Sequence, residues 1–175
     1  PLAPHAAFPP GPPDPSLVHL GDRGSRARAA GLWLAEDEGT ILGTVTVCPQ
    51  GSPWREISRL DEGEFRMLAA TPTAQGRGVG EALVRHAIDR FVATGSEAMV
   101  LSTLPGMAAA HRIYERLGFE RAPDRDWSPL PGVQLIAYQM TLCSGSAGAG
   151  RAHVQGRRER GVHMFRVGGE ERRPG

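Results

Sequence analysis

The sequence contains no lysine and no asparagine, so all 20 of its basic residues are arginine. Both absences remove A-rich codons and therefore indicate a GC-rich coding sequence more than a functional constraint. The lack of lysine nevertheless excludes a Walker phosphate loop, which requires a Gly-Lys-Ser/Thr sequence. Long apolar runs are also absent, since none reaches the roughly 18 residues of a membrane-spanning helix.

Cysteine is scarce, with only Cys48 and Cys143 in the chain. Both lie in apolar, strand-like contexts, which favours buried free thiols over a disulfide or a metal site. The net charge is +1, which gives no case for a nucleic-acid partner. With no visible cleavable signal pattern either, we expect a cytoplasmic protein that binds no metal, nucleic acid or membrane.

Three glycines at alternate positions mark the run Gln75-Gly76-Arg77-Gly78-Val79-Gly80, which lies between a strand-like stretch and a helical pattern. At the start of a helix, such a loop exposes backbone N–H groups to phosphate oxygens, and Arg77 adds a positive charge. The dinucleotide-binding fingerprint does not fit, because the third glycine falls one position early, at Gly80. Taken alone, the run also fits a simple connecting turn.

A second strand, turn and helix pattern extends from Ala98 to Phe119, with Gly118 placed to end the helix. Residues 108–119 have the sequence AAAHRIYERLGF. Together with the glycine loop, this string resembles the GNAT superfamily of acyl-coenzyme-A-dependent N-acetyltransferases. The resemblance covers residues 32–142.

Hydrophobic periodicity predicts the secondary structure of this region. Strands are predicted at 32–35, 41–48, 64–70, 98–104 and 133–142, and helices at 80–92 and 107–117. This order matches the GNAT core from its second strand onward. The resemblance therefore implies an α/β (α+β) fold with a mixed, mostly antiparallel central sheet, splayed strands and flanking helices.

The two ends of the chain depart from the family pattern. Residues 1–30 are rich in proline and offer at most one helix, where the family has a strand and two helices. Residues 144–175 are rich in glycine and arginine without apolar periodicity, which predicts a disordered tail. We therefore expect an irregular segment at 1–30, an N-acetyltransferase domain at 31–143 and a tail at 144–175.

The resemblance assigns roles to particular residues. Tyr114 would act as the general acid toward the thioester sulfur. The main chain of Leu68, Ala69 and Ala70 would contact the pantetheine arm of acetyl-CoA. The pyrophosphate would be held by Gln75, Gly76, Arg77, Gly78, Val79 and Gly80.

The general base is less clearly marked. Some family members carry a glutamate where this chain has Ser102, and serine is a poor base without a partner. Glu64, at the start of the strand that leads into the glycine loop, is the candidate, and a solvated strand-end carboxylate is the alternative. Asp124, Asp126 and two tryptophans lie in loops that either border an acceptor site or simply pack.

The sequence therefore predicts an acetyltransferase that moves an acetyl group from acetyl-CoA to a primary amine by direct attack. The acceptor would be a small-molecule or peptide amine, and a homodimer is left open. Two alternatives remain: an acyl-CoA-binding protein without useful transferase activity, and a degenerate remnant of the family. The fold itself does not identify the amine.

Overall fold

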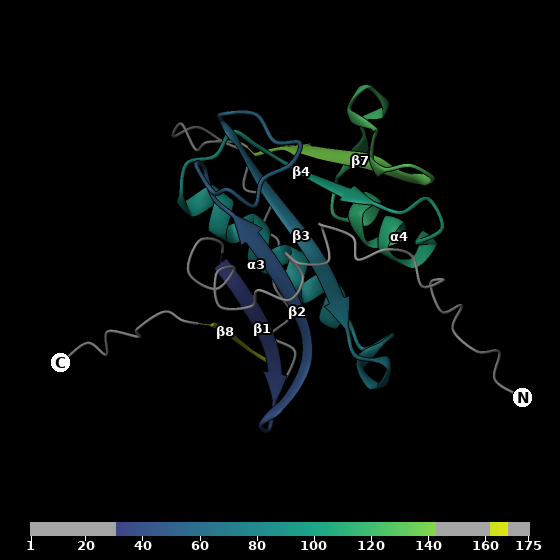
Figure 1. Cartoon of the computed structure of the whole chain (residues 1–175). Coiled ribbons are helices and arrows are strands. Elements are labelled where there is room, and N and C mark those ends of the chain that lie inside the picture. The colour runs from purple at the N-terminus through teal and green to yellow at the C-terminus, as the bar shows by residue number, and fades with distance from the viewer. Residues whose placement is uncertain (1–30, 143–161, 168–175) are drawn as a thin grey trace, which may run out of the picture.

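The computed structural model describes residues 31–142 and 162–167 (Figure 1). The labels of its strands and helices follow Figure 1. The strands are β1 (Gly31–Asp37), β2 (Thr40–Cys48), β3 (Glu62–Ala70), β4 (Ala98–Thr103), β5 (Glu120–Arg121), β6 (Trp127–Leu130), β7 (Val133–Thr141) and β8 (His163–Arg166). The helices are α3 (Val79–Ala93), α4 (Ala108–Arg116) and two 3-10 turns, Pro72–Ala74 and Pro123–Arg125.

One mixed sheet runs through the described residues in the order β5-β7-β4-β3-β2-β1-β8, with β6 paired to β7. The described pairings are antiparallel except that between β3 and β4. Helix α3 connects this parallel pair, because two parallel strands require a crossover between them. The predicted fold class is confirmed.

Helix α3 covers β1, β2 and β3 and lies behind them in Figure 1. Its buried face is formed by Val79, Leu83, Val84, Ala87 and Phe91, as helical spacing predicts. Val92, the last residue of the predicted helix 80–92, is 50% exposed because it lies past the edge of the apolar stripe. None of the helices among the described residues is long and apolar enough to cross a membrane.

A glycine in β3 allows helix α3 to lie close to the sheet. A Cβ atom built on Gly63 would lie 2.3 Å from the ring of Phe91, closer than packed atoms tolerate. Phe91 is 1% exposed and fills the space that a side chain at this position would need. Glycine therefore sets the contact between α3 and the start of β3.

The structure differs from the expected disordered tail at one point. His163–Arg166 forms β8, which pairs with β1 in an antiparallel register. Met164 packs against the main core, and the pairing supplies partners for backbone groups of β1 that would otherwise face outward at a sheet edge. The segment has too few apolar residues to predict a strand by itself. The remaining tail residues, 143–161 and 168–175, and the segment 1–30 lie outside the described part.

Candidate functional site

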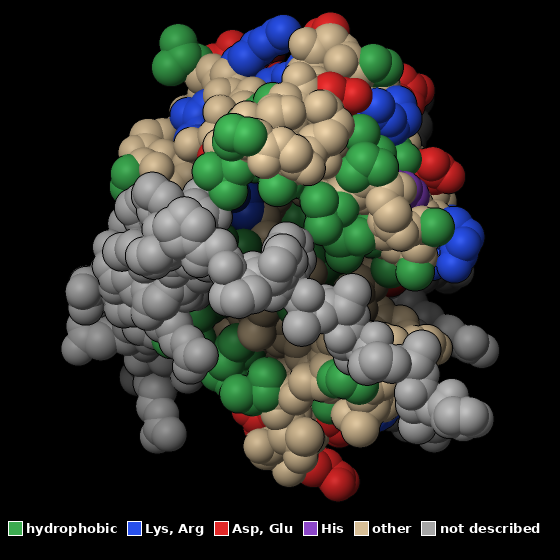
Figure 2. Space-filling view, turned by 45° about the vertical axis from the view of Figure 1, so that its right-hand side comes forward, with side chains coloured by type: hydrophobic (Ala, Val, Ile, Leu, Met, Phe, Trp, Pro, Cys, Tyr) green, Lys and Arg blue, Asp and Glu red, His purple; other side chains and the backbone are tan. Residues whose placement is uncertain are grey.

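Strands β3 and β4 form a fork. They pair only where Glu62, Gly63 and Glu64 face residues 98–100. Beyond this point β3 continues beside β2 to residue 70, whereas β4 continues beside β7 to residue 103. The two arms separate in Figure 1, and Figure 2 shows a hollow beside hydrophobic side chains on the face turned toward the viewer. The splayed strands expected from the resemblance are present.

The β3 arm of the fork contains an irregularity. Two of its residues, Met67 and Leu68, stand opposite the single residue Val45 of β2, which is the arrangement of a β-bulge. Met67 has a φ of 53°, in the left-handed region that non-glycine residues rarely adopt. Such a bulge turns backbone groups away from the regular ladder. Leu68, Ala69 and Ala70 follow on this arm and share no pair with β4.

The glycine loop lies between the β3 arm and helix α3. Gly76 and Gly78 have φ values of 75° and 82°, which explains why glycine occurs at both positions. Gly78 is the N-cap of α3. Within the described part of the chain, the N–H groups of Gly78, Val79 and Gly80 donate no hydrogen bond. This loop therefore presents free donors at the positive end of a helix dipole.

The charged side chain of the glycine loop has a partner in the hairpin between β1 and β2. Arg77 donates to Asp37 at 3.2 Å, and about half of its side chain is exposed. Gln75 is exposed and its backbone N–H donates to Pro72 at the end of the 3-10 turn. The arginine is held close to the loop by a surface ion pair of the kind that contributes little to stability.

Tyr114 lies on the inner face of α4, beside the point where the fork divides. Its ring centroid is 6.0 Å from that of Phe65, the first β3 residue beyond the paired segment, and it also contacts the rings of Phe119 and Tyr138. The side chain is 4% exposed, and its hydroxyl makes no hydrogen bond within the described residues. Burial, with a smaller contribution from Tyr138, raises the pKa of Tyr114 to about 12.

Glu64 lies at the last paired position of the fork and is 1% exposed. Its carboxylate accepts the backbone N–H of Glu56 at 2.9 and 3.1 Å, that of Ile57 at 3.1 Å and that of Ser58 at 3.0 Å. The side chain thus holds the loop between β2 and β3 against the sheet. This is a buried, hydrogen-bonded carboxylate and not a solvated strand-end group.

Two other side chains near Glu64 were not predicted. Arg66 pairs with Glu56 at 2.5 Å and donates to the carbonyl oxygen of Trp54 at 2.8 Å. Burial raises the pKa of Glu56, although Arg66 acts in the opposite direction. The pair joins a residue of the irregular loop to a residue of β3 ten positions later, so sequence spacing gave no signal for it.

Two of the side chains suggested for the acceptor side, Asp126 and Trp127, form hydrogen bonds within the fold. Asp126 accepts from the guanidinium of Arg121 at 2.9 and 3.0 Å and from the N–H of Ala137 at 2.8 Å. The indole N–H of Trp127 donates to the hydroxyl of Ser102 at 3.0 Å. This bond crosses from β6 to the β4 arm and fixes the side chain at the position where some family members carry a glutamate.

A carboxylate in the first turn of α3 connects the two helices. Glu81 accepts from Arg85 on α3 and, at 2.6 Å, from Arg116 on α4. These bonds lower the pKa of Glu81, with the Arg85 hydrogen bond as the largest cause. The pair with Arg85 follows helical spacing and could be predicted, whereas the bond to Arg116 requires the tertiary fold.

Comparisons with known proteins agree with this geometry. The model of the acetyltransferase (GNAT) family matches residues 4–119. N-acetylaspartate synthetase of Danio rerio is 31% identical over 104 residues, covering 58% of this chain and 34% of that protein. Mycothiol acetyltransferase of Cellulomonas flavigena is 33% identical over 129 residues, covering 66% and 36%. The chain thus spans about a third of the length of these two relatives.

Solved structures share the same architecture. An acetyltransferase of Salmonella typhimurium, solved with its cofactor acetyl-CoA, matches with a TM-score of 0.54 and 21% identity, covering 82% of this chain and 83% of that one. The family match begins at residue 4, so it extends further toward the N-terminus than the resemblance seen in the motifs. With a forked sheet, a glycine loop and a family match over most of its length, the chain belongs to the GNAT acetyltransferase family.

Proposed function

We propose that this protein transfers an acetyl group from acetyl-CoA to a primary amine by direct attack, with Tyr114 as the general acid. The observation that carries the proposal is the fork between β3 and β4, which has the glycine loop at the end of one arm and Tyr114 beside its apex. One extended ligand that enters the fork would therefore meet a phosphate-binding loop at one end and a proton donor at the other.

The residues of the fork fit acetyl-CoA as a co-substrate. The free N–H groups of Gly78, Val79 and Gly80 suit pyrophosphate oxygens, and Gln75, Gly76 and Arg77 complete the loop. A Cβ at Gly76 would meet no atom within 4 Å, so the loop is open on that side. The backbone of residues 68–70, which does not pair with β4, would contact the pantetheine arm. Bound acetyl-CoA supplies the thioester that the amine attacks.

Protonation of the leaving thiolate falls to Tyr114. A phenol with a pKa of about 12 is fully protonated near neutral pH and can donate. A free thiol is ordinarily a stronger acid than such a phenol. The proposal therefore requires that the fork shield the leaving thiolate from water, because desolvation raises the pKa of a thiol as well.

The attacking amine must first lose a proton, since an alkylammonium group has a pKa of about 10. Glu64 remains our proposal for the base, acting directly or through water. Its lone pairs are already engaged by three backbone N–H groups, so this role competes with its role in holding the loop. Glu56, whose pKa is raised and whose side chain is partly exposed, is a second carboxylate nearby, in the loop that Glu64 holds.

The acceptor is proposed only as a class, a small-molecule or peptide amine. The relatives carry names that refer to different acceptors, and each aligns over part of its length, so none of these acceptors transfers to this chain. Two alternatives stay open: an acyl-CoA-binding protein without useful transferase activity, and a degenerate family member. Both would retain the fork, but only a transferase would need the hydroxyl of Tyr114.

Calorimetric titration with acetyl-CoA and with coenzyme A tests the proposal. The parent should bind both saturably, and Gly78→Glu should abolish binding because it places a bulky carboxylate in the phosphate loop. Gly39→Glu is a matched control, since Gly39 has a φ of 79°, open space around it and a position in the hairpin between β1 and β2. A folded parent that fails to bind would contradict the transferase proposal. Binding without turnover in a screen of amines would favour the binding protein.

A further inference from the structure

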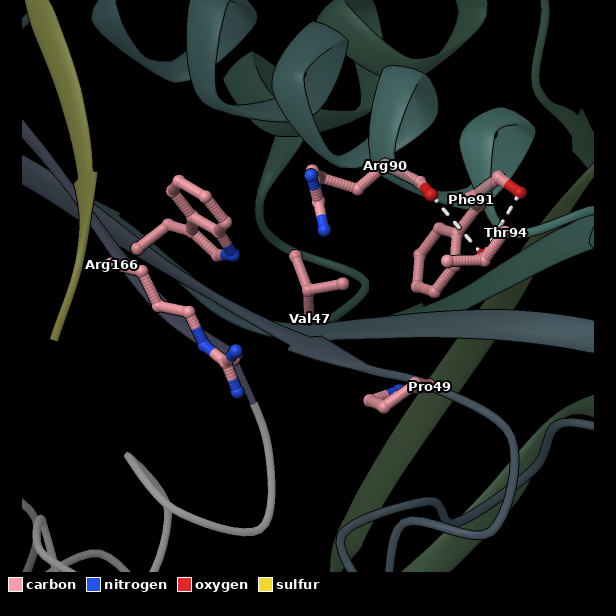
Figure 3. A pocket seen from close by; sticks show the side chains of 8 residues that line it. Val47, Pro49, Arg90, Phe91, Thr94 and Arg166 are labelled. Carbon is pink, nitrogen blue, oxygen red and sulfur yellow. Dashed lines mark hydrogen bonds between the residues drawn. The ribbon is translucent and has the colours of Figure 1, made fainter. Parts of the chain in front are cut away.

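A second cavity lies at the opposite end of helix α3 from the glycine loop. It has a volume of about 90 Å³, and Figure 3 shows the side chains around it. The lining combines the C-terminal turn of α3 with residues from β1, β2 and β8. These residues are Gly31, Trp33, Val47, Pro49, Arg90, Phe91, Thr94 and Arg166.

The charges around this cavity are unbalanced. Among the residues that the structure describes, its lining contains two arginines and no aspartate or glutamate. Arg90 comes from α3 and Arg166 from β8, and neither forms an ion pair within the described residues. Both residues are exposed, so their guanidinium groups are accessible to an anion from solution.

An aromatic surface accompanies the two cations. The guanidinium carbon of Arg90 lies 5.4 Å from the centroid of the Trp33 ring, in a cation–π arrangement. Arg166 is the register partner of Trp33 across the β1–β8 pair, so its side chain leaves the sheet on the same face as that of Trp33. Val47 and Phe91 add apolar surface on the other side (Figure 3). Both arginines thus belong to regular secondary structure and not to loops.

We propose that this cavity binds an oxyanion, the carboxylate or phosphate group of a small metabolite. Arginine forks present paired N–H donors that match such oxygens, and the indole and aliphatic side chains would contact the apolar part of the ligand. A volume of about 90 Å³ accommodates one anionic group with a few attached atoms but not a nucleotide.

The proposed oxyanion site is separate from the acetyl-CoA loop. Helix α3 has 15 residues, so its two ends lie about 20 Å apart at 1.5 Å per residue. The N-terminal end carries the free N–H groups of the glycine loop, whereas Arg90 and Thr94 lie at the C-terminal end. An anion bound at one end can therefore be distinguished from an anion bound at the other by a local probe.

The test is a titration of the full chain with inorganic phosphate and, separately, with acetate at constant ionic strength. The indole N–H resonance of Trp33, assigned with Trp33→Phe, is followed by NMR. The proposal expects a saturable shift for at least one anion, and about tenfold weaker binding in each of Arg90→Gln and Arg166→Gln. Arg112→Gln, which removes an exposed arginine from α4, is the matched control and should bind as the parent does.

Three results would overturn the proposal. The first is a linear, non-saturating shift that is equal in all variants, which indicates charge screening alone. The second is saturable binding that survives both arginine substitutions. The third is a parent that binds neither anion while a Glu170→Gln/Glu171→Gln double variant does, because the chain's own carboxylates would then occupy the site. Preference for phosphate over acetate, or the reverse, identifies the kind of oxyanion.

Discussion

Two loops of this protein present consecutive backbone N–H groups, and they differ in what those groups bind. In the loop between β2 and β3, the N–H groups of Glu56, Ile57 and Ser58 all donate to the carboxylate of Glu64. In the glycine loop, the N–H groups of residues 78–80 have no acceptor within the described chain. The first loop carries its own anion, whereas the second is open to an external one.

The difference shows how the same donor chemistry serves folding in one place and binding in the other. A carboxylate supplied by the chain fixes its loop at every moment, and its hydrogen bonds contribute to the free energy of folding. An open loop contributes those hydrogen bonds only when a ligand arrives. The open loop requires left-handed backbone at Gly76 and Gly78, whereas the loop between β2 and β3 has one such residue, Gly51, outside the segment that donates to Glu64.

The largest expected effect comes from removing the carboxylate of Glu64, to which the loop between β2 and β3 donates. Glu64→Ala removes the acceptor of three partly buried backbone donors, so we expect the free energy of unfolding to fall by about 3 kcal/mol. Urea denaturation of the purified variant measures this change. Glu97→Ala is the control, because its exposed side chain forms no ion pair with any residue that the structure describes and the change should alter stability by less than about 0.5 kcal/mol.

The same position decides between the two roles of Glu64. Glu64→Gln keeps the size of the side chain but removes its basicity. Its amide NH2 group would also face the backbone N–H groups of the loop, so that hydrogen-bond donors meet donors. If the carboxylate only holds the loop, stability falls while kcat per folded molecule and its pH profile stay close to the parent. A large loss of kcat with unchanged stability would identify Glu64 as the base and would show that its role is not only structural.

The second largest effect separates binding at the open loop from the chemistry at the fork. Tyr114→Phe should lower kcat about 100-fold, the lower end for loss of a general acid, while the affinity for acetyl-CoA is preserved. Stability should change little, since the hydroxyl makes no hydrogen bond within the described residues. Steady-state kinetics and calorimetry measure the two quantities. An unchanged kcat would remove Tyr114 from the reaction.

The glycine loop could be predicted from the sequence, but the loop that donates to Glu64 could not. Glycines at alternate positions before a helix are a local signal, because left-handed backbone requires them. Glu64 and its three donors are six to eight residues apart in an irregular loop, with no glycine or capping pattern to mark them. The hydrogen bond between Glu81 and Arg116, 35 residues apart, and the pairing of β8 with β1 are likewise tertiary contacts without a local signal.

Alkaline pH should lower the free energy of unfolding through the ionisation of Cys48. Burial and the charge of Glu64 raise the pKa of Cys48 from 9.0 to about 12. The unfolded chain loses this proton above about pH 9, whereas the folded chain keeps it, so stability is complete below pH 9 and declines as the pH rises toward 12. We expect a loss of about 1 kcal/mol between pH 9 and 10, before tyrosines titrate. Denaturation of Cys48→Ala over this range should show a flatter dependence; an equal slope would contradict the assignment.

The smallest effect tests the charge beside the open loop. Glu81→Gln removes a carboxylate from the first turn of α3, next to the N–H groups that would bind pyrophosphate, and also breaks the bond to Arg116 on α4. Loss of the negative charge should strengthen phosphate binding, whereas loss of the link between helices should weaken it. Each contribution is below about 1 kcal/mol, because Arg116 is largely exposed.

Arg116→Gln breaks the same link but leaves the carboxylate, so the two variants separate the contributions. If charge dominates, acetyl-CoA binds more tightly to Glu81→Gln than to Arg116→Gln in calorimetry, and the difference shrinks as salt is added. Equal affinities would mean that the open loop is insensitive to the charge beside it, and that its free N–H groups alone determine how it binds an anion.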